Sequence, residues 1–192
     1  TPSDTTNYNT AAVDVEVTVS AEFLEGNVLL EGNQYGDTLT ATVIGAQEEA
    51  KLVYSFYRNG ETEPFQTGGN PEYTLKAEDF GKTISVKVTA EGYAGELTPG
   101  YGTPIKPRDI SVKADSPSKT YGKEDPSLTW SILTGSLVEG DQLKGKLTRE
   151  EGEDAGTYKI LQGTLTNANN PCYAITFLSG TLTINKAQYT VR

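Results

Sequence analysis

Carboxylates are the most numerous groups in this chain that could do chemistry, since 26 of its 192 residues are Asp or Glu. Two carboxylates about 5–10 Å apart could hydrolyse a glycosidic bond, and several converging oxygens could bind calcium. The acids crowd most densely at residues 150–154, and Glu124 and Asp125 form a second group. Neither group has the spacing of a calcium loop or a motif that places a catalytic pair. We therefore predict solvated turns and no cofactor, with Ca²⁺ binding as the alternative.

The chain lacks the groups on which most catalytic and metal sites depend. Histidine is absent, which removes the commonest general base and the commonest metal ligand. A Ser-His-Asp triad therefore cannot form. Cys172 is the single cysteine, so it can form neither an internal disulfide nor a zinc site built on cysteines. It is either a small residue at the start of a strand or half of an intermolecular disulfide. We predict no catalytic or metal-ligating residues and no enzyme activity.

Tyrosines are the best candidates for binding. Tyr57 alternates with Phe56 and faces outward if Phe56 faces the core. Tyr93 and Tyr101 lie in a stretch that carries glycines at 92, 95, 100 and 102. Exposed tyrosine beside glycine suits sugar stacking or protein contact. Tyr57, Tyr93 and Tyr101 are thus our candidate ligand contacts, with edge-strand packing or contact between domains as the structural alternative.

Short strands must position these residues. Alternating apolar and polar residues predict a series of strands, and one helical turn suits 76–81. The expected strands are 13–20, 38–44, 52–58, 72–75, 83–89, 110–114, 128–133, 143–148, 157–161, 173–177 and 181–184. No segment keeps a helical period over three turns. The pattern therefore predicts an all-β fold, a sandwich or barrel.

Length and charge divide the chain into two tandem modules. A chain of 192 residues suits two domains of about 80–100 residues. Residues 1–107 hold six Lys or Arg against 16 Asp or Glu, whereas residues 108–192 hold ten of each. The junction at 103–112 resembles 183–191, about 79 residues later, because both end a strand near a Lys and begin another after a polar hinge. Residues 188–192 are expected to start a following module or a tail.

Other bounds concern the ends of the chain and its partners. Residues 1–12 are polar and aperiodic, which predicts a linker or a disordered N-terminus. The chain has no Met, so we expect that residue 1 is not a native start and that any signal peptide has been removed. No apolar run approaches the ~18 residues of a membrane span. An acidic first half disfavours nucleic acid and anionic membrane as partners, and its bland interpretation is a soluble monomer.

Residues 54–60 and 73–90 resemble a bacterial immunoglobulin-like surface module. The resemblance implies a β-sandwich at 13–106, in which Phe56 takes the central position more often held by Trp. It also implies a corner at Asp79-Phe80-Gly81 that leads into the penultimate strands. This resemblance covers about residues 35–95.

Residues 107–187 resemble the MBG-type repeat modules of bacterial adhesin-like proteins, the subtype with a Tyr-Gly-x signature. The matching stretches are 121–126, 137–141, 152–158 and 180–187, with Tyr121-Gly122 as the signature. From the residues themselves, Asp154 to Tyr158 has the form of a tyrosine corner. Trp130 alternates onto the face of Leu128 and Ile132, which favours a core position. Two immunoglobulin-like sandwiches are expected, with a grasp-like second module carrying a short helix near 137–140 as the alternative.

Together the resemblances imply a non-catalytic, structural or adhesin-like module pair from a bacterial secreted or cell-surface protein. The absence of disulfides and glycosylation sequons also fits a bacterial exterior. The alternatives are a carbohydrate- or mucin-binding module, with host or environmental glycans or proteins as partners, and accessory domains of a surface enzyme.

Overall fold

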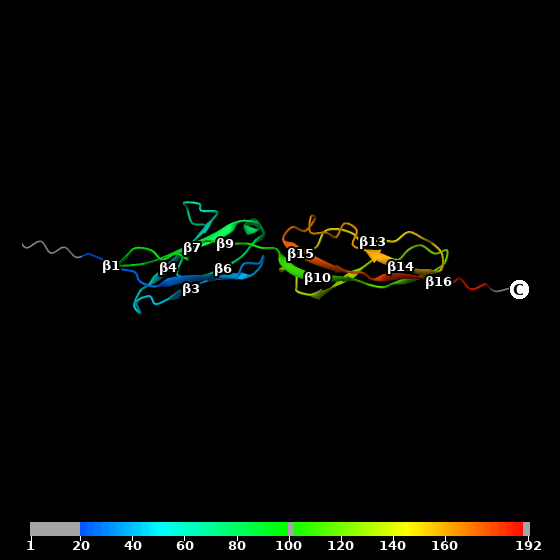
Figure 1. Ribbon diagram of the computed structural model, residues 1–192, viewed down its shortest axis with the longest axis horizontal. Coiled ribbons are helices and arrows are strands. Elements are labelled where there is room, and N and C mark those ends of the chain that lie inside the picture. Colours follow the sequence, from blue (N-terminus) through cyan, green and yellow to red (C-terminus); the bar gives the residue numbers. More distant parts are fainter. Residues whose placement is uncertain (1–19, 100–101, 190–192) are drawn as a thin grey trace, which may run out of the picture.

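The computed structural model describes residues 20–99 and 102–189. The predicted all-β sandwich fold is confirmed, and η1 (Ala77–Asp79) is the only helical element in these ranges. Two β-modules lie end to end along the long axis (Figure 1). We call residues 20–105 the first module and residues 108–189 the second module.

The first module packs two antiparallel sheets around one core, in the strand orders β2-β3-β6 and β5-β4-β7-β9, and adds a short parallel pair, β1-β8. Its strands are β1 (Glu22–Phe23), β2 (Asn27–Glu31), β3 (Thr38–Ile44), β4 (Leu52–Arg58), β5 (Gln66–Gly68), β6 (Glu72–Thr74), β7 (Thr83–Ala90), β8 (Tyr93–Ala94) and β9 (Thr103–Pro104). Phe56 lies at the centre and is fully buried, as its alternation with Tyr57 predicts. Burial of a side chain of this size contributes about 1.5–3 kcal/mol.

A buried carboxylate fixes the corner after β6. Asp79 in η1 is fully buried, and a buried charge needs close partners. It accepts hydrogen bonds from Arg58 Nε at 2.6 Å, from the Tyr73 hydroxyl at 2.8 Å and from the Lys76 backbone N–H at 2.8 Å. These bonds tie β4, β6 and η1 together, so the corner is an ionic part of the core.

The second module packs two other sheets, β12-β10-β15 and β11-β16-β14-β13. Its strands are β10 (Arg108–Ala114), β11 (Ser118–Thr120), β12 (Trp130–Thr134), β13 (Thr148–Arg149), β14 (Gly156–Leu161), β15 (Tyr173–Leu178) and β16 (Thr181–Asn185). The pairs β10-β15 and β11-β16 are parallel. Ile110, Val112 and Ile160 are buried in the core between the sheets. Trp130 is half-buried and packs against this core.

The tyrosine corner is confirmed, because the Tyr158 hydroxyl donates to the Asp154 carbonyl oxygen at 2.9 Å. The strands expected at 38–44 and 52–58 match β3 and β4 to the residue. Residues 13–19 of the first expected strand lie outside the described residues. The short strands β2 and β11 were not expected.

Two expectations for the second module are wrong. Of the strand expected at 143–148, only Thr148 is in a strand, β13. The reason is Asn170, whose side chain bonds the backbone N–H and carbonyl of Lys144 at 2.7 and 2.8 Å, in place of a neighbouring strand. The short helix near 137–140 is a turn, closed by the Asp141 N–H on the Val138 carbonyl at 3.0 Å.

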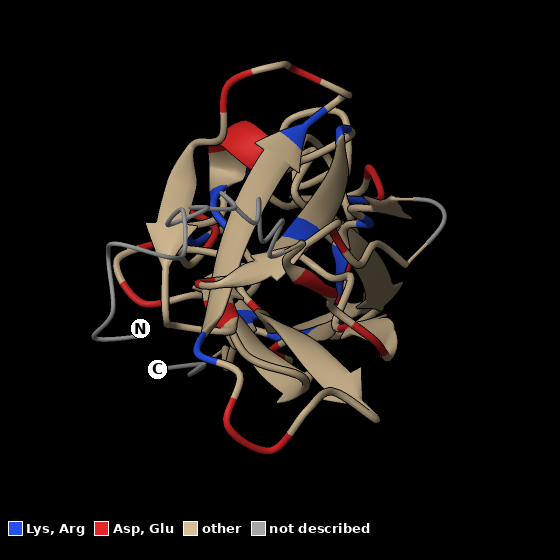
Figure 2. Ribbon diagram, turned by 90° about the vertical axis from the view of Figure 1, so that its left-hand side faces the viewer, with Lys and Arg blue, Asp and Glu red and all other residues tan. Residues whose placement is uncertain are grey.

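Charge lies mainly on the surface. A view along the long axis shows acidic residues on loops that project around the molecule (Figure 2). Among the described residues, no helix is long and apolar enough to cross a membrane. In the same ranges, no three acidic or cysteine side chains gather as a metal site would require.

Candidate functional site

The junction between the modules joins them through backbone and side-chain hydrogen bonds. The first module holds the linking residue Lys106 through its own backbone, because Lys106 N–H donates to Asn33 O at 2.7 Å and Tyr35 N–H to Lys106 O at 2.9 Å. The adjacent Ile105 is buried in the first core. On the other side, Arg108 N–H donates to Cys172 O at 2.8 Å as β10 begins. Little free chain therefore separates the modules.

A tight turn carries the contact across. The Asp37 N–H donates to Gln34 O at 2.9 Å, which closes a β-turn around Tyr35 and Gly36. Gly36 has φ +81°, a conformation that a third residue of a turn adopts readily only as glycine. A Cβ on Gly36 would also lie 2.2 Å from Val138 Cγ2 of the second module. The turn thus needs glycine for its backbone and for the close approach of its neighbour.

Tyr35 is part of the first module by sequence and of the second core by packing. It is 5% exposed and lies among the buried residues of the second core. Its ring meets that of Tyr173 edge to face, with centroids 5.6 Å apart and planes at 87°. This geometry is favourable for aromatic pairs.

A shared carboxylate ties both tyrosines down. The Tyr35 hydroxyl donates to Asp141 Oδ2 at 2.8 Å, and the Tyr173 hydroxyl donates to the same oxygen. Tyr173 also accepts the Val138 N–H at 2.9 Å. Burial, and next the bond to Asp141, raise the pKa of Tyr35 to about 12. The same two causes raise the pKa of Tyr173, so both hydroxyls stay protonated donors at neutral pH.

Arg108 reinforces the junction from its rim. Its Nη1 donates to the Tyr35 carbonyl at 3.3 Å and to Asp37 Oδ1 at 3.1 Å, while its Nε donates to Ser136 O at 3.0 Å. One guanidinium therefore bonds both modules, which a fork of five donors allows. A second polar contact joins Gln34 Nε2 to Asp109 Oδ2 at 2.9 Å.

The polar side chains of the junction are bonded to one another. Asp141 already accepts two hydroxyls, and no described buried side-chain polar atom lacks a hydrogen-bond partner. Burial raises the pKa of the adjacent Cys172 thiol, with the Asp141 charge as a second cause, and a raised pKa disfavours the reactive thiolate. What the geometry shows at this site is a packed and hydrogen-bonded contact between two β-modules.

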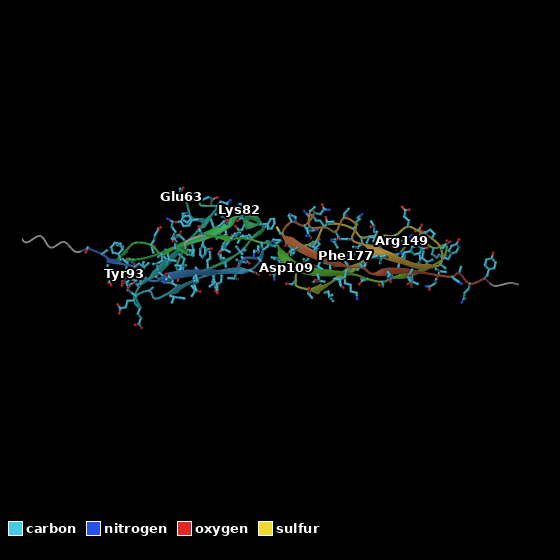
Figure 3. All side chains as sticks on the ribbon, in the orientation of Figure 1. Glu63, Lys82, Tyr93, Asp109, Arg149 and Phe177 are labelled. Atoms are coloured by element: carbon cyan, nitrogen blue, oxygen red, sulfur yellow. The ribbon has the colours of Figure 1, made fainter. Side chains whose placement is uncertain are left out.

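The predicted ligand contacts lie elsewhere and apart from one another. Tyr57 is half-exposed on β4 opposite Ser85, with Lys87 Nζ 5.8 Å from its ring centroid. Tyr93 is half-buried against the first core and lies at the end of the first module away from Asp109 (Figure 3). Tyr101 lies outside the described residues. The structure does not bring Tyr57 and Tyr93 together.

One acid from each predicted acidic group, Glu153 and Asp125, meets basic partners, while the other acids of 150–154 and 124–125 form no described ion pair. Asp125 pairs with Lys119 Nζ at 2.5 Å and with Arg149 Nε at 2.6 Å. Glu153 pairs with the same two cations. Chiefly through the hydrogen bond from Arg149, the pKa of Asp125 is lowered to about 2. The network is an ion-paired brace of the second module.

Sequence reasoning missed Tyr35 and its partners. A signal was available, because Tyr35-Gly36 repeats the Tyr121-Gly122 dipeptide of the second half.

None of the curated proteins compared with the chain matches it. One known family does match, over the second module: residues 110–183 form an MBG domain of the YGX type.

Proposed function

We propose that this chain is a non-catalytic, adhesin-like structural pair of modules from a bacterial secreted or cell-surface protein, in which the first, immunoglobulin-like module is locked end to end to the MBG domain. The observation that carries the proposal is the insertion of Tyr35 into the second core. The MBG domain is a surface-associated repeat module, which supports an extracellular location. In this proposal the pair acts as a stalk, an elongated support built of rigid modules. A stalk needs joints that resist bending, and this joint is packed and hydrogen-bonded.

The test is a distance measurement across the joint. Glu63→Cys in the first module and Glu151→Cys in the second, both at exposed positions, carry spin labels in a Cys172→Ala background. A locked pair gives one narrow distance, and Tyr35→Ala broadens it. Tyr121→Ala, which removes an exposed tyrosine from the other end of the second module, is the matched control. A broad distribution before any change at Tyr35 would contradict the stalk proposal.

Glycan binding receives less support from the geometry. A sugar platform needs aromatic faces on one surface. Tyr93 follows the end of β7, where Ala90 pairs with Leu52 of β4. Tyr57 lies five residues further along β4, so the two tyrosines do not form one platform. A glycan array, run at protein concentrations that capture millimolar binding, is expected to give no signal. A signal lost with Tyr57→Ala would instead favour the carbohydrate-binding alternative.

A further inference from the structure

The turn that the first module inserts into the MBG domain has a counterpart in the MBG domain itself, at the end away from the first module. In the first module, Tyr35 N–H donates to Lys106 O at 2.9 Å and Asp37 N–H to Gln34 O at 2.9 Å. In the second module, Tyr121 N–H donates to Asn185 O at 2.8 Å and Lys123 N–H to Thr120 O at 3.0 Å.

The strand pairing and the backbone of the two turns also agree. Gln34 forms a parallel bridge with Lys106, and Thr120 pairs in parallel with Asn185. Gly36 has φ +81° and Gly122 has φ +78°. Tyr121-Gly122 is therefore the counterpart of Tyr35-Gly36, one module further along.

The two turns differ in what covers them. Tyr35 is 5% exposed, whereas Tyr121 is 52% exposed. A Cβ on Gly36 would collide with Val138, but a Cβ on Gly122 would meet nothing within 4 Å. The Tyr121 turn adjoins the end of β16, on the side of the second module that faces away from the first (Figure 1).

The segment that follows each turn's partner shows the same contrast. When Asn185 is aligned with Lys106, Tyr189 takes the place of Ile110. Ile110 is 2% exposed in the second core, and Tyr189 is 95% exposed. The surface is therefore bare at two positions that the first junction covers.

Charge around the second turn specifies the occupant further. Lys123 stands where Asp37 stands in the first turn, so an arginine in the place of Arg108 would be repelled there. In the same alignment, Ala187 takes the place of Arg108 and introduces no such charge. The residues that flank the turn are ion-paired, because Lys119 and Arg149 both bind Asp125. These features fit a module that has no arginine at its entry.

We propose that the Tyr121-Gly122 turn is a docking site for a further β-module of the MBG kind, which receives the Tyr121 side chain in its core as the second module receives Tyr35. The inference rests on the proposed stalk function and assigns the Tyr-Gly signature its role. That role is to plug each module into the next. Tyr121 then donates its hydroxyl to the counterpart of Asp141, and the following module covers Tyr189 with its sheet.

The test uses an extended chain, residues 1–187 followed by a second copy of residues 109–192, which keeps Ala187 at the entry. Tyr121→Ala in the first copy is expected to lower the thermal midpoint of the appended module by about 4–8 °C or more. The same substitution is expected to leave the thermal midpoint of the two-module chain unchanged. Tyr121→Phe, paired with Asp141→Asn in the appended copy, is the milder set. The double variant should then lose no more than the appended Asp141→Asn variant alone.

Tyr35→Ala in the same chain separates the two proposals. A loss with Tyr35→Ala but the same midpoint with and without Tyr121→Ala overturns the docking site and leaves the stalk in place. No loss with either variant overturns both. Additive losses from Tyr121→Phe and the appended Asp141→Asn would likewise overturn the hydrogen bond that the proposal requires.

Discussion

Tyr35 and Asp141 join the two modules through one hydrogen bond, 2.8 Å long, between a side chain of the first module and a carboxylate of the second. Neither residue belongs to a strand. Tyr35 lies in the turn between β2 and β3, and Asp141 follows the turn at Glu139-Gly140. Two loops therefore make this contact, and Arg108 at the start of β10 reinforces it.

The first prediction is that Tyr35→Ala destabilises the second module. Truncating a buried aromatic side chain costs about 3–5 kcal/mol, whereas Tyr35→Phe removes only a hydroxyl bond and costs about 1–2 kcal/mol. Trp130 is the only tryptophan of the chain and lies in the second module, so its fluorescence reports that module in a denaturant titration. Tyr121→Ala is the control and should leave the transition in place. An unchanged Trp130 transition in Tyr35→Ala would contradict the coupling.

The sequence predicted the strands whose residues alternate between apolar and polar, and it missed the contacts between residues far apart in the chain. Alternation identified β3 and β4 because each buries one face against a core within its own module. It failed at 143–148 because Asn170 replaces a partner strand there, a contact between residues 26 positions apart. Local periodicity carries no information on such a contact.

The candidate site was missed for a related reason. Tyr35 lies in a turn, has no periodic neighbours, and is buried only because another module covers it. The exposed Tyr121 in the same dipeptide shows that sequence alone does not decide burial here. Phe56 and Tyr158 could be predicted because their partners lie in their own sheet or a few residues upstream.

The second prediction concerns alkaline pH. The pKa of Tyr35 is raised to about 12 in the folded chain, whereas an unfolded tyrosine titrates near 10. The raised pKa stabilises the fold fully below about pH 10, and this contribution is lost as pH rises from about 10 to 12. The free energy of unfolding should therefore fall less steeply in Tyr35→Phe over that window. Equal slopes for the two proteins, measured through Trp130 fluorescence, would contradict the assignment.

The third prediction concerns acid. The pKa of Asp125 is lowered to about 2 by hydrogen bonds from Arg149 and Lys119, against an ordinary value near 3.9. A depressed pKa gives stability that is present above about pH 4 and lost as pH falls towards 2. Asp125→Asn should lower the stability of the second module at neutral pH and flatten its acid dependence. The exposure of the Asp125 side chain makes the effect small.

Asp115→Asn is the matched control for the acid titration. Asp115 is exposed and accepts a hydrogen bond from the Thr129 hydroxyl at 2.7 Å, without a described ion pair. Urea titrations at several pH values, followed through Trp130, compare the two variants. An acid dependence as steep in Asp125→Asn as in the unchanged chain would show that another group is responsible.

The fourth prediction separates the first core from the junction. Asp79→Ala leaves the Arg58 guanidinium, whose side chain is 14% exposed, without its buried partner. Breaking a buried ion pair costs about 3–5 kcal/mol, and the Tyr73 hydroxyl and the Lys76 N–H lose their acceptor as well.

Circular dichroism of the Asp79→Ala variant should show the first module unfolding early. The Trp130 transition should move at least as far as it does in Tyr35→Ala, because unfolding of the first module removes Tyr35 from the second core together with the partners of Arg108 and Asp109. Glu78→Ala removes the exposed partner of the same arginine and should cost less than about 1 kcal/mol. Equal losses from Asp79→Ala and Glu78→Ala would mean that the buried carboxylate does not hold the corner.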